Sequence, residues 1–197
     1  ATARENAKVV CYFSAGSYED WRPDASDFPE AALGNPLEGW DGEWWLDISN
    51  SEVRTLMRAR LDLAVERGCD AVDPDNVNAW ENKTGLGITQ TMQLEYNRFL
   101  ADEAHTRNLS IALKNDQLQL KELSDWFDMA VNEECAAYEE CNAYASFTAS
   151  DKPVFHIEYV DDWADAEALA AEVCSVGPNL DTLIKTWDLG AERRACE

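Results

Sequence analysis

The sequence predicts an α/β fold in which helices cover parallel strands, and two observations lead to it. Short apolar segments alternate along the chain with segments whose apolar residues recur at three- and four-residue spacing. Strands and helices that alternate in this way form parallel sheets with right-handed crossovers. Polar side chains also follow nearly every predicted strand. In a parallel arrangement these positions are the carboxyl ends of the strands, where catalytic groups lie.

The composition indicates one globular domain over residues 1–197 with an acidic surface. The chain carries 39 Asp and Glu against 16 Lys and Arg, a formal net charge of -23. A nucleic-acid partner is not expected, because phosphate binding needs a basic face. A membrane partner is not expected either, because no apolar run of about 18 residues occurs. The charge serves solubility or an attraction to a cationic substrate.

The predicted strands are apolar segments bounded by turn residues. They cover residues 8–16, 44–48, 69–76, 109–115, 127–133 and 153–159, with a doubtful seventh at 180–189. The predicted helices cover residues 24–33, 49–67, a segment capped by Thr89, and residues 118–123, 136–147 and 164–173. Ser49 or Ser51 caps the second of these helices and Gly68 ends it.

The stretch C-D-A-V-D-P-D-N at residues 69–76 reads as a short buried strand with carboxylates at its exit. Pro74 cannot donate a ladder hydrogen bond, so the strand is expected to stop there. Asp75 and Asn76 then lie at its carboxyl end. The alternative is a simple turn, because Asp, Pro and Asn dominate turns.

Polar residues at the strand exits converge on one face if the strands are parallel. They are Tyr12, Ser14, Asp47, Asp73, Asp75, Lys114, Asn115, Asn132, Glu133, Glu158 and Tyr159. Two carboxylates from different strands are the minimum for glycoside hydrolysis, in which one protonates the leaving oxygen and the other attacks or activates water.

Other chemistries find less support. His105 lies on a predicted helix, and mid-strand His156 fits a core role better than a ligand role. There is no Gly-rich phosphate loop and no G-x-S-x-G elbow, so no cofactor is expected. The Trp residues of the early loops can stack on sugar rings or pack in the core. They are Trp21, Trp40, Trp44, Trp45 and Trp80.

Six Cys and no C-x-x-C pair favour three disulfides in an oxidising compartment over a metal site, with free core thiols as the alternative.

Five motifs together resemble glycoside hydrolase family 114, the secreted (β/α)8-barrel endo-α-1,4-polygalactosaminidases. They are C-Y-F-S-A-G-S-Y-E-D-W-R-P-D, W-W-L-D-I, G-C-D-A-V-D-P-D-N-V, L-K-N-D and V-N-E-E-C-A-A-Y-E-E-C, in family order over nearly the whole chain. The resemblance implies cleavage of galactosaminogalactan-type polysaccharide at deacetylated galactosamine linkages. Such a polysaccharide is cationic and would be attracted to an acidic protein.

The resemblance also implies roles for individual residues. Asp75 and Glu133 match the catalytic carboxylates. The matched cleft positions are Tyr12, Asp73, Asn76, Lys114, Asn115, Asn132, Glu158 and Tyr159, and Asp47 joins them as a strand-exit residue. Cys135 and Cys141 match an expected disulfide. We predict Cys174–Cys196 and Cys11–Cys69 as the other two, the last requiring adjacent strands with Cα atoms within about 7 Å.

Within this pair, Asp75 is expected to be the nucleophile, because Lys114 and Asn76 stabilise its ionised form. Glu133 is then the acid/base, since burial among aromatic residues favours its protonated form. Asp73 is the second choice for the role of Asp75. A retaining mechanism is expected, which implies carboxyl groups about 5–5.5 Å apart.

One departure from the family pattern bears on the fold. Family members carry about two strands before the segment that matches residues 9–16, so the barrel is expected to lack its first one or two strands in this chain. A missing segment or a second chain would then complete the barrel. A catalytically inactive carbohydrate-binding relative is the alternative function.

Overall fold

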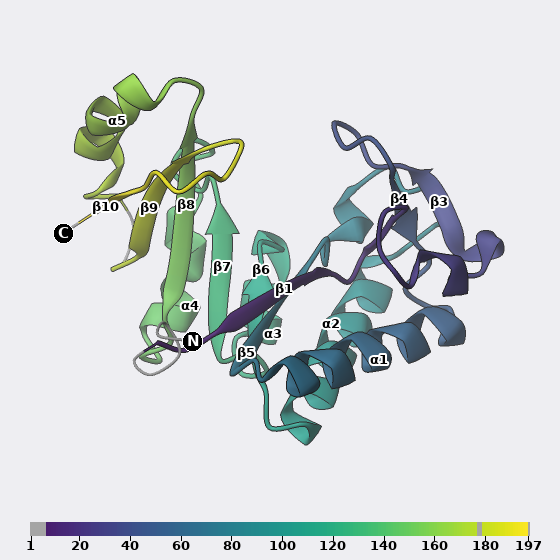
Figure 1. Cartoon of the computed structure of the whole chain (residues 1–197). Coiled ribbons are helices and arrows are strands. Elements are labelled where there is room, and N and C mark those ends of the chain that lie inside the picture. Colours follow the sequence, from purple (N-terminus) through teal and green to yellow (C-terminus); the bar gives the residue numbers. More distant parts are fainter. Residues whose placement is uncertain (1–6, 177–178, 197) are drawn as a thin grey trace. The chain divides into compact units, whose positions relative to one another are not determined.

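The computed structural model describes residues 7–176 and 179–196. The chain divides into two compact units, Ala1–Lys114 and Asn115–Glu197, each of which is described by itself (Figure 1). The single domain over residues 1–197 and the eight-stranded barrel stay predictions. Residues 1–6 lie outside the described residues. The expectation that the barrel lacks one or two strands before residue 9 therefore also stays a prediction.

Three parallel strands form the centre of the first unit. They are β1 (Val10–Ser14), β5 (Ala71–Asp75) and β6 (Ser110–Lys114). β1 pairs with β5 along its whole length and ends with Ser14 opposite Asp75, and β5 pairs with β6 in the same direction. The predicted strands at these positions, and their parallel direction, are confirmed.

The expectation that the strand stops at Pro74 is wrong, because β5 continues through it to Asp75. β5 pairs with β6 at Ala71 and Val72, whereas the carbonyl of Asp75 accepts the N–H groups of Ala15 and Gly16, which directly follow β1. A residue without an N–H is therefore tolerated at position 74, where the ladder toward β6 has ended.

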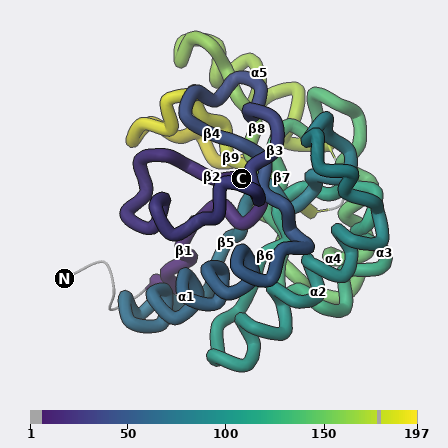
Figure 2. Tube along the Cα trace, turned by 90° about the vertical axis from the view of Figure 1, so that its right-hand side faces the viewer, coloured from purple at the N-terminus to yellow at the C-terminus, as the bar shows by residue number. Residues whose placement is uncertain are grey.

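Two long helices, α1 (Ser51–Arg67) and α2 (Gln90–Thr106), run next to each other beside these strands (Figure 2). The residue that caps α1 is Asn50, not Ser49 or Ser51, since its side chain accepts the N–H of Glu52. Gly68 ends α1 in the left-handed conformation at φ 72°, as predicted. Thr89 caps α2, also as predicted.

The second sheet of this unit is antiparallel and corrects the prediction for residues 44–48. β4 (Glu43–Leu46) lies between β2 (Ser17–Glu19) and β3 (Leu33–Pro36), and both pairings are antiparallel. A parallel crossover needs a dozen or more residues, usually a helix. Residues 24–33 form two 3₁₀ turns instead of the predicted helix, and a short connection joins β3 to β4, so those two strands pair as a hairpin.

The second unit contains three parallel strands. They are β7 (Met129–Glu133), β8 (Val154–Val160) and β9 (Asp181–Thr186), and β10 (Arg194–Ala195) pairs antiparallel with β9. The strands predicted at 127–133 and 153–159 are confirmed, and the doubtful segment at 180–189 is a strand.

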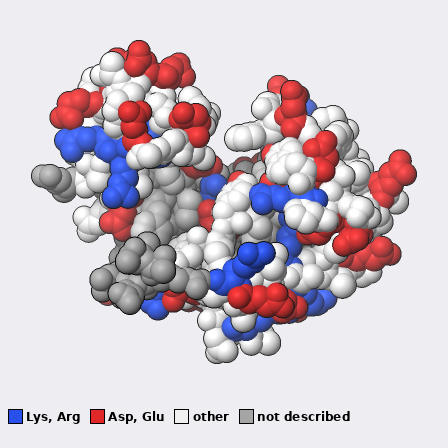
Figure 3. All heavy atoms as spheres, in the orientation of Figure 1, with Lys and Arg blue, Asp and Glu red and all other residues white. Residues whose placement is uncertain are grey.

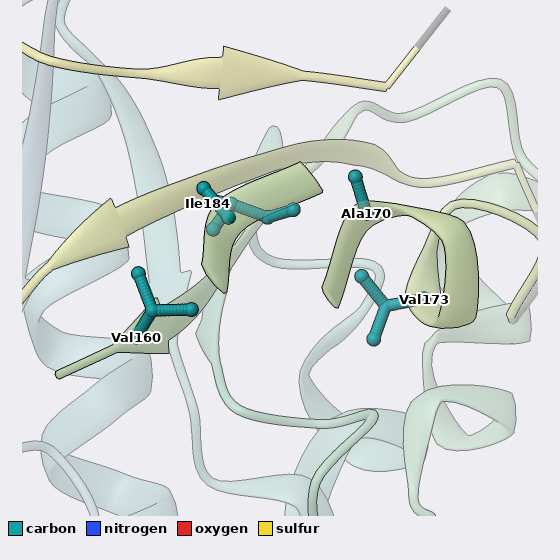
Figure 4. Packing of buried hydrophobic residues seen from close by; sticks show 5 residues of the cluster. Val160, Ala170, Val173 and Ile184 are labelled. Atoms are coloured by element: carbon teal, nitrogen blue, oxygen red, sulfur yellow. The ribbon is translucent and has the colours of Figure 1, made fainter. Parts of the chain in front are cut away.

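Helix α5 (Ala166–Val173) covers β8 and β9 through a small apolar core. Figure 4 shows Ala170 and Val173 of the helix beside Val160 of β8 and Ile184 of β9. The Ala-rich composition of residues 164–173 predicts this helix, because Ala has the highest helix propensity.

The predicted helix at residues 136–147 is wrong. Glu134 and Glu139 adopt left-handed backbone conformations at φ 66° and 58°, and a disulfide closes residues 135–141 into a compact loop. A 3₁₀ turn and the short α4 (Ala145–Thr148) follow. The loop constraint prevents the helical path that propensity favours.

The remaining short elements are single turns. They are α3 (Leu120–Leu123) and the 3₁₀ turns η1 (Ala25–Asp27), η2 (Glu30–Ala32), η3 (Ala79–Glu81), η4 (Gln117–Gln119), η5 (Cys141–Tyr144) and η6 (Trp163–Asp165).

All three predicted disulfides are present. The Cα atoms of Cys11 and Cys69 are 5.9 Å apart, those of Cys135 and Cys141 4.8 Å, and those of Cys174 and Cys196 5.3 Å. Cys11 lies on β1 and Cys69 shortly precedes β5, so the adjacent strands that this bridge requires are those two.

The surface is acidic in both units. In Figure 3, Asp and Glu side chains are scattered over the visible face and do not gather in one patch. Among the described residues, no helix is both long and apolar enough to cross a membrane.

Candidate active site

In the first unit, a cluster of polar side chains surrounds Asp75, the last residue of β5. One oxygen of its carboxylate accepts the hydroxyl of Tyr12 at 3.0 Å. The other oxygen accepts the backbone N–H of Asn76 at 2.8 Å and lies 3.4 Å from the ammonium group of Lys114. We call Asp75, Tyr12, Asn76 and Lys114 the Asp75 cluster; its three donors stabilise a negative charge on the carboxylate.

Strand register explains why these residues meet. Tyr12 pairs with Asp73 and Ser14 with Asp75, so all four side chains project from one face of the β1–β5 pair. Tyr12 is the diagonal neighbour of Asp75, within reach of a long side chain. Lys114 is the last residue of the next strand, β6, and its side chain is 6% exposed.

Further carboxylates surround the cluster and alter its electrostatics. Burial, and then the charge and hydrogen bond of Asp75, raise the pKa of Tyr12 well above its usual value. Burial also raises the pKa of Glu43, and the charges of Glu19 and Asp75 raise it further, against a lowering by the hydrogen bond from Ser17. Tyr12 therefore stays a neutral donor.

In the second unit, Glu133 occupies the corresponding position at the end of β7. Its carboxylate accepts the hydroxyl of Tyr159 at 2.5 Å. Glu133 pairs with Ile157 in the neighbouring strand, which places it on the same face as Tyr159 two residues further on. The ring of Tyr159 stacks on Trp187, with ring centroids 4.2 Å apart and planes at 16°. Glu133, Tyr159 and Trp187 form what we call the Glu133 cluster.

Two amides fix the end of β7. The side-chain oxygen of Asn115 accepts the backbone N–H of Glu133 at 3.0 Å and the side-chain amide of Asn132 at 3.2 Å. Asn132 in turn accepts the N–H of Cys135 at 3.0 Å. These two predicted residues therefore hold the backbone on both sides of Glu133.

Glu158 is buried and binds the loop that follows Glu133. Its carboxylate accepts the N–H of Ala136 at 2.7 Å and lies 2.8 Å from Nε2 of His156, whose Nδ1 lies 2.9 Å from the hydroxyl of Thr182. Burial raises the pKa of Glu134, and the charges of Glu158 and Glu133 add to the effect. Glu158 and His156 thus support the loop from the core.

The two remaining predicted residues differ in their surroundings. Asp73 lies on the same face as Asp75, two residues before it on β5. Asp47 accepts both the N–H and the hydroxyl of Ser49, which makes it part of the turn that precedes α1. No contact of Asp47 joins it to the Asp75 cluster among the interactions of the described residues.

The early tryptophans divide between exposure and burial. Trp21 and Trp40 are 54% and 59% exposed, whereas Trp45 is buried in the core. Trp187, which the sequence reasoning missed, lies beside Glu133's partner Tyr159 and is 53% exposed. The sequence signal was available, because an aromatic residue directly follows the strand at 181–186.

Two other features of the structure do not involve Asp75 or Glu133. A cavity of about 440 Å³ opens between β1 and α1 and is lined mainly by apolar side chains; Tyr12 lines it, but Asp75 does not. Cys135, Cys141 and His156 lie close together, but the disulfide removes both thiolates as metal ligands.

The sequence profile of glycoside-hydrolase family GH114 matches residues 1–197. The chain belongs to this family. It is also similar to the crystal structure of Aspergillus fumigatus Ega3 in complex with galactosamine, with a TM-score of 0.93 and 44% identity over 98% of this chain and 80% of that one.

More distant similarity supports the fold. The glycoside hydrolase domain of PelA from Pseudomonas aeruginosa has a TM-score of 0.72 at 15% identity, covering 98% of this chain and 83% of that one. Eubacterium rectale Amy13B has a TM-score of 0.51 at 11% identity, covering 80% of this chain and 42% of that one. The chain matches no sequence among the curated proteins.

As a GH114 member the protein is a glycoside hydrolase, and its fold is α/β with mostly parallel strands. Asp75 and Glu133 are each the last residue of a parallel strand.

Proposed function

We propose that this GH114 hydrolase cleaves α-1,4-linked galactosamine within galactosaminogalactan-type polysaccharide, and that Asp75 and Glu133 are its catalytic pair. The observation that carries the assignment is the position of both carboxylates. Each is the last residue of a parallel strand and accepts a tyrosine hydroxyl from a neighbouring strand. The similarity to a galactosamine-bound relative at 44% identity supports the substrate class.

The surroundings of the two carboxylates suit different roles. Asp75 has an ammonium group at 3.4 Å and two hydrogen-bond donors, which suits a nucleophile that must be charged. We assign the proton transfer to Glu133, which accepts the hydroxyl of Tyr159, whose ring stacks on Trp187. Asp73 stays the second choice for Asp75.

The proposed reaction is a double displacement that retains the anomeric configuration. Asp75 attacks the anomeric carbon while Glu133 gives its proton to the leaving glycosidic oxygen, which forms a glycosyl ester and a free chain end. Glu133 then takes a proton from water, and the resulting hydroxide attacks the anomeric carbon and releases Asp75. Water is the only co-reactant, and both carboxyl groups return to their starting states.

Replacing each carboxylate by its amide tests the pair. Asp75→Asn and Glu133→Gln are nearly isosteric, and each is expected to lower kcat by at least about 10³-fold with the fold intact. Glu134→Gln is the matched control that changes a neighbouring carboxylate, and Asp73→Asn tests the second choice for the role of Asp75. Release of reducing ends from partly deacetylated polymer measures the rate, and a folded Asp75→Asn or Glu133→Gln enzyme with near wild-type activity contradicts the assignment.

The net charge of -23 supports a cationic substrate. If acidic side chains attract the polymer, kcat/KM falls between low and molar salt, because the Debye length shortens from about 10 Å at 0.1 M to about 3 Å at 1 M. An unchanged kcat/KM would show that the charge serves solubility alone.

We further infer that the enzyme acts outside the cell, since three disulfides persist in oxidising compartments. The (β/α)8 barrel is retained as the proposed architecture.

A further inference from the structure

A chain of buried side chains connects Glu43 to the backbone beside Asp75. The hydroxyl of Ser17 donates to the Glu43 carboxylate at 2.6 Å, and the hydroxyls of Ser17 and Ser14 are also 2.6 Å apart. The side-chain amide of Asn76 donates to Ser14 at 2.9 Å and to Ser17 at 3.2 Å. Both serines are fully buried, and Glu43 is 7% exposed.

The donor count permits one arrangement of this chain when Glu43 is ionised. Ser17 has one hydroxyl hydrogen, which goes to Glu43, so Ser14 must donate to Ser17. Each serine oxygen then has two lone pairs left for its two donors. Ser17 accepts from Ser14 and Asn76, and Ser14 accepts from Asn76 and the N–H of Ser17. The Glu43 charge thus fixes which way the Asn76 amide points.

The backbone of Asn76 is left-handed at φ 60°, a conformation that Asn tolerates. In this conformation its N–H turns back onto the Asp75 carboxylate at 2.8 Å. The chain passes very close on the other side: a Cβ on Gly16 would lie 1.7 Å from the Asn76 carbonyl oxygen. Gly16 is therefore required for this approach, and the amide bonds hold Asn76 in place.

We propose that Glu43, Ser17 and Ser14 are positioning residues that hold the Asp75 carboxylate in its reactive geometry through Asn76. The proposal rests on the proposed function, in which Asp75 is a catalytic residue. None of the three was singled out for this role in the sequence, because they come from three strands, β4, β2 and β1, that only the fold brings together.

Protonation of Glu43 weakens this arrangement. A protonated carboxyl still has an oxygen that accepts the Ser17 hydroxyl, but a hydrogen bond to a neutral acceptor is weaker than one to a charged acceptor. The Ser17 hydroxyl, and through it Ser14 and the Asn76 amide, is then held less firmly. Burial raises the pKa of Glu43, the hydrogen bond from Ser17 lowers it, the charges of Glu19 and Asp75 raise it further, and the charge of Arg22 lowers it. Activity therefore declines on the acidic side as Glu43 takes up its proton.

Three substitutions in the purified enzyme test the positioning role. Ser17→Ala removes the link and is expected to lower kcat by about 10- to 100-fold with KM within about twofold, because a small displacement of a reacting group costs this much. Glu43→Leu has the same expected effect. Glu43→Gln keeps an acceptor for Ser17, so kcat stays within about threefold, and its activity extends to lower pH because position 43 no longer titrates.

The matched control is Thr84→Val, which removes a buried hydroxyl of the same unit that accepts the N–H of Leu86. Thermal unfolding of each variant separates lost stability from lost positioning. If Ser17→Ala matches Thr84→Val in kcat, the proposal is overturned. If Ser17→Ala and Glu43→Leu do not fold, the pH profile of Glu43→Gln decides, and a profile identical to the wild type overturns the proposal.

Asp75→Asn, measured in the same assay, separates this proposal from the one on which it rests. An inactive Asp75→Asn with an unimpaired Ser17→Ala rejects the positioning network alone. An active Asp75→Asn rejects the assignment of Asp75, and with it the role of the network.

Discussion

Replacing Tyr12 by phenylalanine removes one hydroxyl and leaves the aromatic ring on β1. That hydroxyl donates to the Asp75 carboxylate at 3.0 Å. Hydrogen bonds to charged groups contribute about 1.5–3 kcal/mol, and the low end applies because Tyr12 is 50% exposed and water competes. A loss of about 1.5 kcal/mol in the transition state corresponds to roughly a tenfold fall in kcat/KM.

The pH dependence sharpens this prediction. The pKa of Tyr12 is raised by the partial burial of its side chain and then by Asp75, so the hydroxyl keeps its proton throughout the working range. The ratio of wild-type to Tyr12→Phe activity is therefore expected to be constant from about pH 4 to pH 9. Stability should change little, since the ring and its packing remain.

Initial rates of reducing-end release across this pH range provide the measurement. Tyr138→Phe is the matched control, because Tyr138 is 68% exposed in the second unit and removal of its hydroxyl leaves the rate unchanged. Activity of Tyr12→Phe within twofold of wild type would refute the reasoning. So would a loss that appears only at high pH, because it would mean that Tyr12 titrates.

Three further predictions follow from the same structure. Tyr159→Phe removes the hydrogen bond to Glu133 and should lower kcat by about 10- to 100-fold in the same rate assay; an undiminished kcat would count against the role of Glu133. Glu134→Asn relieves a left-handed glutamate and should raise the free energy of unfolding by about 0.5–1 kcal/mol in urea titrations. Because the pKa of Glu134 is raised in the fold, its charged form is destabilising, so the gain should be larger at pH 7 than at pH 4, and equal gains would contradict this. Asp24→Asn should cost about 1–2 kcal/mol at pH 7, because it breaks the ion pair with buried Arg60. Burial opposes ionisation of Asp24, but Arg60 prevails and lowers its pKa, so this cost should disappear as the pH falls through the folded pKa, below about 4; a cost that persists at pH 3 would refute it.

Most of the parallel strands could be predicted from the sequence, because local signals specify them. β1, β6 and β8 are apolar runs with clear ends, and the Ala-rich and capped segments form α5 and α2. The antiparallel pairing of β4 could not be predicted in the same way. The sequence pattern of a strand is the same whether the strand pairs parallel or antiparallel. The short connection between β3 and β4 sets the antiparallel direction.

Some residues of the candidate site could likewise be predicted from the strand pattern, and others could not. Asp75, Tyr12 and Lys114 lie at strand exits, so strand pattern alone brings them to one edge. Glu43 lies at the start of its strand, and nothing local indicates that its carboxylate reaches Ser17. Glu158 follows the strand pattern, yet its carboxylate binds backbone N–H groups of the loop after Glu133, because the alternation along β8 directs it into the core.

The strand exits share a feature that connects the sequence to the chemistry. A left-handed residue directly follows β5, β6 and β7, at Asn76, Asn115 and Glu134, with φ of 60°, 51° and 66°. Such a residue turns the chain sharply, so the last side chain of each strand stays at the edge. Asn tolerates this conformation, whereas for glutamate it costs about 1–2 kcal/mol. An Asn after a strand is thus a readable sign of this turn at the first two exits. At the third exit the residue is a glutamate, so the sequence does not indicate the turn. The free-energy cost of the left-handed backbone falls at Glu134, directly after Glu133.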